Sequence, residues 1–441
     1  MTGNEWLALG MLGAFFAFLV TGIPVAIALA ASGLVFGYLG FGTGLFNLLP
    51  ARIYGVVTNY TLLALPLFIF MGIMLEKSRM AEDLIDVIGH AMGRLRGGMG
   101  LAIVLVGVLM GASSGVVGAT VVTMGLLALR PLVARGYDKG VACGAICASG
   151  TLGQIIPPSL VLILLADILG LSVGTLFAAA MVPGLMLAGI MALYIVGLGV
   201  FRPQMVPAIP AAERAALSRR ALAGKMIRVV TPPLVLVFAV LGSIVGGVAA
   251  PTEAASMGAL GALLLALVAG RLDLATLKEV CRASLVTSAM VFFILICAQP
   301  FGLAFRGLGG ERLIEHLFSL VPGGLEGSLL FMMALIFALG FFLEWIEISY
   351  IVLPMFLPVF AGTELDMVWL SILVAMNLQT SFLTPPFGWA LFFLKGVAPA
   401  GVTTVDIYRG VIPFIGLQLI GLSLLFVFPQ LTSWLPKLIG W

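Results

Sequence analysis

Two pairs of consecutive prolines interrupt long apolar stretches of the chain, at Pro157-Pro158 and Pro385-Pro386. A proline inside a helix removes a backbone hydrogen bond and collides with an earlier carbonyl group, so each pair predicts an unwound backbone. In an apolar medium, unwound backbone is tolerated where protein or water covers it, and its freed carbonyl groups are good ligands for Na+. A single pair would equally fit a helix kink. Because the break recurs in two similar segments, we favour a paired transport site.

A cluster of small and polar residues, Gly-Ala-Ser-Ser-Gly-Val-Val-Gly-Ala-Thr, occupies positions 111–120. Glycine and serine at this density allow helices to pack closely, which is one interpretation. The alternative is the tip of a re-entrant hairpin whose hydroxyl and carbonyl groups face an ion. The cluster alone leaves both open, and its pairing with the first Pro-Pro segment favours the ion site.

Two acidic residues, Glu344 and Glu347, lie within the apolar stretch 329–357. Carboxylates at membrane depth are costly, so by default they are candidates for a functional site. On a helix their spacing would place them on one face, where they could bind a cation, carry a proton or orient backbone amides. The alternative places them on a hairpin turn at the membrane surface. We favour function, because a lipid-facing carboxylate at that depth would be unstable.

The amino-acid composition shows which environment these segments need. Of the 441 residues, 62% are hydrophobic and 9% are charged. Soluble proteins carry about 25% charged residues. A spanning helix needs about 20 apolar residues, so the chain has room for about a dozen crossings. The long apolar runs lack the period-2 alternation of a barrel, which predicts an all-α polytopic membrane protein.

The sequence lacks the patterns of several other function classes. The cysteines have no CxxC spacing, so neither a metal site nor a structural disulfide is expected. No HExxH, GxSxG or nucleotide-binding pattern stands out, so we predict a protein that is not an enzyme. Transport would then be driven by an ion gradient or by another subunit. Nucleic-acid binding has no support, because the basic residues cluster in loops.

The chain divides at a basic polar linker, residues 202–228, which the positive-inside rule places in the cytoplasm. The flanking halves, residues 1–201 and 229–441, share one order of apolar spans, charged amphipathic stretch, interrupted run and Pro-Pro break. We expect hairpins at about 101–133 and 326–360, and broken helices at about 141–171 and 368–395. Paired interruptions favour an inverted repeat with its binding site at the membrane midplane, and a parallel repeat stays open.

Several of these segments resemble one transporter family. Residues 150–159 (Gly-Thr-Leu-Gly-Gln-Ile-Ile-Pro-Pro-Ser), 113–115 (Ser-Ser-Gly) and 384–388 (Thr-Pro-Pro-Phe-Gly) are similar to the large membrane subunit of tripartite ATP-independent periplasmic (TRAP) transporters. The resemblance covers nearly the whole chain, and the doubled Pro-Pro pattern is specific. Residues 344–348 and 378–387 look most similar to the branch of mannitol/chloroaromatic compound transporters.

The resemblance implies a fold, a transport reaction and partners. The fold would be an inverted-repeat ion-transporter type, with two re-entrant hairpins, two Pro-Pro-broken helices, and a transport domain that moves elevator-like against a scaffold domain. A periplasmic substrate-binding protein would deliver an organic acid, and a small four-helix membrane subunit would brace the chain in the lipid bilayer. Uptake would cross the bacterial inner membrane, would be coupled to Na+ and would need no other cofactor.

The resemblance also implies two Na+ sites, carried over position by position. The first site would combine a serine with backbone groups, from Ser113 or Ser114, Gly153, Ile156 and Pro158. The second site would use Ser381, Thr384 and Phe387. The family usually has Gly where Ser381 stands, so the geometry of the second site is expected to differ.

The substrate, by the same resemblance, would lie between the two hairpins. Helix N-termini and exposed amides there could stabilise a carboxylate without a buried arginine. The family often has Asp where Glu344 stands. The candidate substrate contacts are the polar residues Ser149, Thr151, Gln154, Glu344, Glu347, Asn377 and Gln379.

Three alternatives make different predictions. A stand-alone Na+-coupled anion carrier with the same two-hairpin plan would need no binding protein. An intramembrane enzyme with Glu344 and Glu347 as acid-base groups would have one polar site, so the duplicated breaks count against it. A passive channel would conduct without a sodium gradient.

Overall fold

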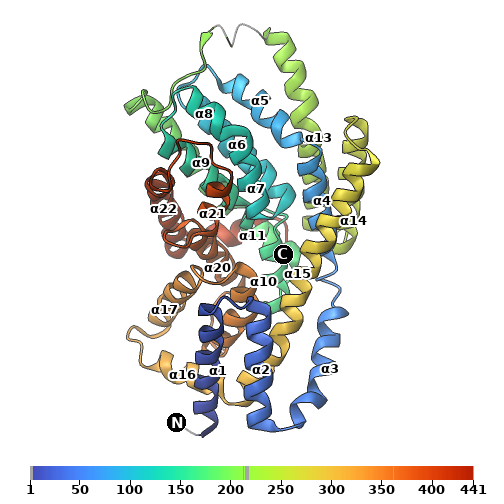
Figure 1. The fold of residues 1–441 in the computed structure, drawn as a ribbon, viewed down its shortest axis with the longest axis vertical. Helices are drawn as coiled ribbons and strands as arrows, with labels where there is room; N and C mark the ends of the chain where they lie inside the picture. Colours follow the sequence, from blue (N-terminus) through green and yellow to red (C-terminus); the bar gives the residue numbers. More distant parts are fainter. Residues whose placement is uncertain (1–2, 212, 214–217, 361, 441) are drawn as a thin grey trace. The chain divides into compact units, whose positions relative to one another are not determined.

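The chain is helical throughout the part that the structure describes (Figure 1). The structure is a computed structural model that describes residues 3–211, 213, 218–360 and 362–440. Of Ser113, Ser114 and Arg219 it describes the backbone alone. No β-strand occurs within those ranges, which confirms the prediction of an all-α protein.

Seven stretches among the described residues are long and apolar enough to cross a membrane, which confirms a polytopic membrane protein. They are α1 (Gly3–Val20), α11 (Val173–Phe201), α13 (Arg219–Val245), α14 (Pro251–Val268), α15 (Leu274–Gly307), α22 (Thr404–Val427) and the stretch Val117–Ala134. An eighth arises if α16 (Gly310–Ser319) and α17 (Gly324–Leu339), which meet at 117°, form one span. Other apolar stretches among the described residues form helices of 10–17 residues, so the expected number of about a dozen crossings stays a prediction.

The helices form two compact units, and each unit draws on both halves of the sequence. The first unit contains residues 1–63 and 285–366, and the second contains residues 64–284 and 367–441. The second unit therefore holds both Pro-Pro breaks, and the first holds Glu344 and Glu347. The division into repeat halves at residues 202–228 stays a prediction.

The first unit is built from α1, α2 (Val25–Phe41), α3 (Gly44–Val57) and the later part of α15. Helices α2 and α15 touch at their backbones, because a Cβ on Gly33 would stand 2.4 Å from the nitrogen of Phe301. The buried ring of Phe301 also contacts the ring of Phe15 in α1, with centroids 5.5 Å apart. The unit continues through α16 and α17 into α18 (Trp345–Glu347), η3 (Ile348–Val352), α19 (Leu353–Phe356) and η4 (Leu357–Phe360).

The second unit is larger and is centred on one buried helix, α9 (Lys139–Thr151). Every residue of α9 from Val141 to Thr151 is buried. Helix α22 lies directly against it, because a Cβ on Gly144 would stand 2.1 Å from the carbonyl oxygen of Gly410. The surrounding elements are α4 (Ala64–Lys77), α5 (Met80–Met92), α6 (Gly98–Ser114), α7 (Val117–Met124), η1 (Gly125–Leu129), α8 (Arg130–Ala134), η2 (Leu152–Gln154), α10 (Leu160–Leu169), α11, α13, α14, α20 (Met367–Leu383), α21 (Trp389–Val397) and α23 (Gln430–Leu438).

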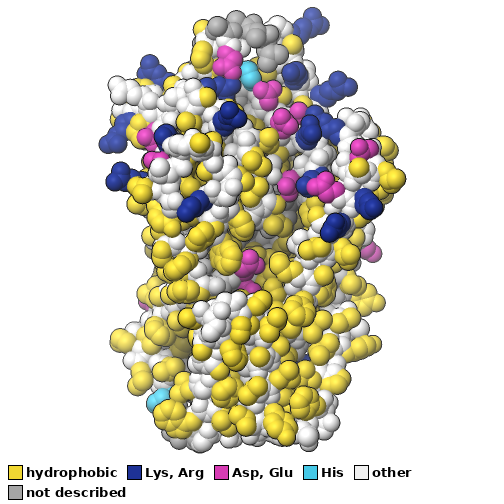
Figure 2. Space-filling view, viewed as in Figure 1, with side chains coloured by type: hydrophobic (Ala, Val, Ile, Leu, Met, Phe, Trp, Pro, Cys, Tyr) yellow, Lys and Arg dark blue, Asp and Glu magenta, His cyan; other side chains and the backbone are white. Residues whose placement is uncertain are grey.

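Charged side chains gather at one end of the second unit, around α5, α8 and the beginning of α13 (Figure 2). Helix α5 is amphipathic: it buries Leu84 and Ile88 and exposes Glu82 and Asp86. Its apolar face is therefore buried inside the protein, against α6 and α13, and its charged face is exposed.

The basic linker packs against this charged end of the second unit. The backbone amide of Asp138 donates to the carbonyl oxygen of Met205 at 2.8 Å, and that of Ile209 donates to Gly93 at 3.0 Å. Helix α13 begins at Arg219, so part of the segment predicted as linker is helical.

Candidate functional site

The first Pro-Pro break separates α9 from α10 and is buried throughout. Helix α9 ends at Thr151, the 3-10 turn η2 follows, and α10 begins at Leu160. The Pro157-Pro158 peptide bond is cis. The hydroxyl of Ser159 donates to the carbonyl oxygen of Gln154 at 2.6 Å, which ties the two sides of the break together. Residues 149–160 are all buried, so the freed backbone groups face protein rather than lipid.

The second Pro-Pro break separates α20 from α21 and is partly open. Helix α20 ends at Leu383 and α21 begins at Trp389, with a cis bond at Pro385-Pro386. The hydroxyl of Tyr408 donates to the carbonyl oxygen of Pro386 at 2.9 Å. Pro386 and Phe387 are exposed, and Phe387 has 46% of its surface free. The two breaks therefore present different surroundings to any ligand.

The tip between α6 and α7 lies against the first break. A Cβ on Gly111 would stand 2.8 Å from the Cα of Gly153, so the two backbones touch. Gly115 has φ +60°, a conformation that glycine adopts without strain, and it lets the chain turn from α6 into α7. The structure thus brings the predicted small-residue cluster and the first break together. The side chains of Ser113 and Ser114 lie outside what it describes.

The candidate residues of the second Na+ site lie at the end of α20. The hydroxyl of Ser381 donates to the carbonyl oxygen of Leu378 at 2.8 Å, and that of Thr384 donates to Thr380 at 2.8 Å. A hydroxyl that donates its proton keeps acceptor lone pairs, which point away from the helix backbone and suit a cation. Ser381 is buried and Thr384 is partly exposed.

Several candidate substrate contacts are buried polar side chains with unsatisfied atoms. Gln154 in η2 and Gln379 in α20 are fully buried, and neither amide has a hydrogen-bond partner among the described residues. The hydroxyl of Ser149 likewise has none. Asn377 is buried in the same helix as Gln379. A buried polar group without a partner costs about 1–3 kcal/mol, so Ser149, Gln154 and Gln379 point to a ligand or to ordered water.

The two glutamates are placed differently from the expectation of one shared helix face. Glu344 precedes α18 with extended backbone, φ −75° and ψ 166°, and only Glu347 is helical. The reason is that α17 ends at Leu339, so the chain must turn before the next helix starts. Glu347 is buried, and its Oε2 atom has no hydrogen-bond partner in the described part of the chain. Both residues belong to the first unit, whereas the other candidates belong to the second.

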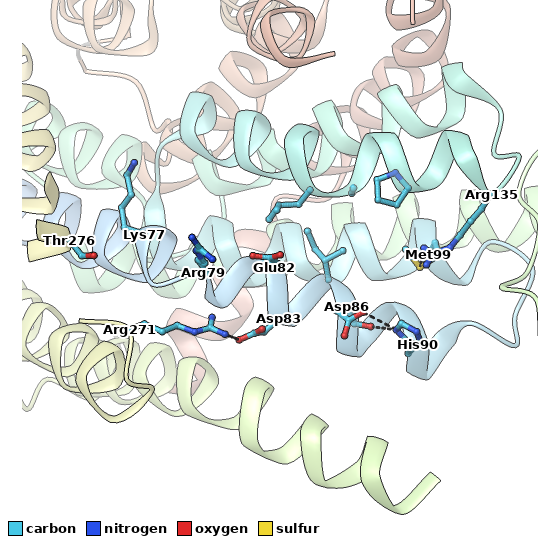
Figure 3. Close-up of a pocket in the computed structure, with 14 residues that line it drawn as sticks. Lys77, Arg79, Glu82, Asp83, Asp86, His90, Met99, Arg135, Arg271 and Thr276 are labelled. Atoms are coloured by element: carbon cyan, nitrogen blue, oxygen red, sulfur yellow. Dashed lines mark hydrogen bonds and ion pairs between the residues drawn. The ribbon is translucent and has the colours of Figure 1, made fainter. Parts of the chain in front are cut away.

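A cavity of about 650 Å³ lies at the charged end of the second unit, beside α5 (Figure 3). The side chain of Arg271 reaches Asp83 at 2.8 Å, and His90 lies 3.1 Å from Asp86. Acidic and basic side chains are mixed along its wall, so the electrostatic potential in the cavity is not uniformly positive and does not favour an anion. None of the candidate site residues lines it.

One buried polar residue of the second unit escaped the sequence analysis. Gln418 is fully buried in α22, and its Nε2 atom donates to the hydroxyl of Thr151 at 3.2 Å. The available signal was a lone amide inside an apolar span, residues 412–428.

The comparison with known proteins decides the family. Residues 12–431 match the family described as the DctM component of the tripartite ATP-independent periplasmic transporter. The chain belongs to this family. It is a subunit of a transporter and not an enzyme.

Relatives agree with the family, and a solved structure shares the fold. The chain is 32% identical to the C4-dicarboxylate TRAP transporter large permease protein DctM of Pseudomonas aeruginosa, over 89% of this chain and 90% of that protein. It is 28% identical to the sialic acid TRAP transporter large permease protein SiaM of Vibrio cholerae, over 97% of each. The YdaH transporter of Alcanivorax borkumensis shares the fold, with a TM-score of 0.60 at 13% identity, over 97% of this chain and 98% of that one.

Proposed function

We propose that this DctM-family subunit carries an organic acid across the bacterial inner membrane, coupled to Na+ and with no other cofactor. A periplasmic substrate-binding protein would deliver the acid, and a small four-helix membrane subunit would brace the chain. Relatives named for a C4-dicarboxylate and for sialic acid support a carboxylate as the substrate class. The resemblance to the mannitol/chloroaromatic branch extends the proposal to aromatic carboxylates.

The observation that carries the proposal is the pair of buried, partnerless amides beside the two helix breaks. Gln154 lies just before Pro157-Pro158, and Gln379 lies one and a half turns before Pro385-Pro386. An apolar bundle gains nothing from burying such groups unless a ligand or ordered water satisfies them. An amide can donate to a carboxylate through nitrogen and can coordinate a cation through oxygen. Buried amides of this kind therefore suit an acid that moves together with Na+.

Two Na+ sites are proposed at the breaks. The first would take Ser113 or Ser114 with backbone groups of Gly153, Ile156 and Pro158, and the second would take Ser381, Thr384 and Phe387. The close contact of Gly111 with Gly153 supports the first set. The lone pairs left on Ser381 and Thr384 support the second. Substrate contacts would come from Ser149, Thr151, Gln154, Asn377 and Gln379, while Glu344 and Glu347 belong to the first unit and stay candidates from the sequence.

The proposed mechanism is an elevator with two re-entrant hairpins. The existence of two compact units supports it, because an elevator needs a body that moves and a body that stays. The turn at Gly115 between α6 and α7, and the turn between the end of α17 at Leu339 and the start of α18 at Trp345, support hairpin geometry in each half.

The test is solute uptake into liposomes that contain this chain with its small membrane subunit. Labelled succinate, sialic acid and a chlorinated benzoate would be offered with and without the binding protein, under an inward Na+ gradient or choline. We expect uptake of one of these acids that needs both Na+ and the binding protein. Uptake that needs Na+ alone would favour the stand-alone carrier. Uptake that needs neither would contradict the proposal.

A further inference from the structure

The orientation of the buried Gln418 amide follows from its partner. The hydroxyl of Thr151 donates its proton to the carbonyl oxygen of Ala148 at 2.8 Å. It has no second proton, so toward Gln418, at 3.2 Å, it can only accept. The Nε2 atom must therefore face Thr151, which settles the usual ambiguity between amide nitrogen and oxygen. The Oε1 atom is left facing elsewhere, buried and without a hydrogen-bond partner among the described residues.

The packing of α22 shows what lies at the level of Gln418. Helix α20 runs antiparallel to it, because Trp369 donates to the carbonyl oxygen of Leu425 at 2.8 Å while Met376 lies beside Gly421. Gln379 is one turn beyond Met376, and Gln418 is one turn before Gly421. The two amides therefore stand at one level of the helix pair.

Helix α9 brings the third partner to the same level. It runs parallel to α22, since Gly140 contacts Gly410 near the start of both helices and Thr151 contacts Gln418 further along. At Thr151 helix α9 gives way to η2, which ends in Gln154 and which α20 also contacts. Gln154, Gln379 and Gln418 thus form a glutamine layer at the first helix break.

The glutamine layer is neutral. No Asp, Glu, Lys or Arg occurs at residues 149–155, 376–382 or 415–421, which are the segments that form it. A carbonyl oxygen without a donor needs a proton donor or a cation, and neutral oxygens in a buried setting suit a monovalent hard cation.

We propose that Gln418 is a ligand of a monovalent alkali cation, Na+, held in the glutamine layer, with Oε1 as the coordinating atom and Thr151 holding the amide in place. The inference rests on the proposed Na+-coupled function and adds a residue from α22, outside both Pro-Pro segments, to the transport site.

The experiment measures how Na+ stabilises the full-length protein in detergent. The melting temperature is followed as NaCl replaces choline chloride at constant ionic strength, for the wild type, Gln418→Leu and Gln430→Leu. Leucine fills a similar volume without an oxygen, and Gln430 is exposed, so its variant is a matched control. We expect the half-saturating Na+ concentration to rise tenfold or more in Gln418→Leu and to stay unchanged in Gln430→Leu. An unchanged half-saturating Na+ concentration in Gln418→Leu would overturn the inference. It is the result expected if the layer held only water.

A second variant separates coordination from positioning. Gln418→Glu keeps a coordinating oxygen and removes the donor to Thr151, so a ligand role predicts that it binds Na+ more tightly than Gln418→Leu. A loss equal to that of Gln418→Leu would overturn the ligand role. Should the leucine variant not fold, Gln418→Asn withdraws the carbonyl group by one methylene and gives the same comparison.

The wild-type titration keeps this inference apart from the proposed function. A wild type that responds to Na+ while Gln418→Leu responds equally would refute Gln418 alone. A wild type that responds no differently to NaCl and choline chloride would refute the Na+ coupling itself.

Discussion

The hydroxyl of Thr384 donates its proton to the carbonyl oxygen of Thr380 and keeps its lone pairs, which is the arrangement that a cation ligand needs. Thr384→Ala removes this oxygen. We expect a loss of about 1–3 kcal/mol of Na+ binding, which raises the Na+ concentration for half-maximal uptake about tenfold. Thr384→Ser keeps the hydroxyl and is expected to behave as the wild type. Equal Na+ dependence in the alanine and serine variants would remove Thr384 from the ion site.

Asp273 provides a test of pH dependence outside the spanning segments. Hydrogen bonds from the side chain and backbone of Thr276 hold the pKa of the Asp273 carboxyl below its ordinary value of 3.8. A lowered pKa means that the ionised form stabilises the fold above the unfolded pKa, and that this stability is lost as pH falls through the folded pKa. We expect Asp273→Ala to melt below the wild type at pH 7, with a gap that closes in acid below 3.8. A gap that does not shrink as the pH falls progressively below 3.8 would contradict this.

At the scale of elements, the contact between α9 and α22 depends on glycine. A Cβ on Gly410 would stand 2.0 Å from the carbonyl oxygen of Gly140, which the backbone cannot accommodate without moving, whereas a Cβ on Gly416 would meet nothing within 4 Å. We expect Gly410→Ala to destabilise the protein by about 1–3 kcal/mol through overpacking. Gly416→Ala is expected to be neutral or to stabilise by up to about 1 kcal/mol, because alanine favours a helix. The comparison of melting temperatures checks both, and equal values would show that the helices are not in backbone contact.

The ends of the broken helices could be predicted from the sequence, because proline acts locally. Helix α9 ends within six residues of Pro157, and α20 ends within two residues of Pro385. The turn before Glu347 could not be predicted, since a spacing of three says nothing about where a helix starts. The pairing of Gln418 with Thr151 joins residues 267 positions apart, and only the register of two packed helices reveals it. The amphipathic pattern of helix α5 could be predicted from the sequence, but the ion pair of its Asp83 with Arg271 could not.

At the scale of the whole molecule, the sequence predicted the class and the order of its parts, and the family match confirmed the class. Which segments make up each of the two compact units could not be predicted, because each unit combines segments from both halves of the sequence. Helix α15 also passes from one unit to the other. Hydropathy also registers apolar stretches without seeing where a helix stops, so the expected number of crossings stays a prediction.

The central claim is that this protein moves an organic acid together with Na+. The most direct test measures 22Na+ entry into liposomes that contain this chain and its small subunit. The Na+ concentrations inside and outside are equal at the start. Addition of the binding protein loaded with a transported acid supplies the only gradient. We predict that 22Na+ enters with the acid and that Gln154→Leu abolishes both fluxes. Acid entry without 22Na+ entry would contradict the account.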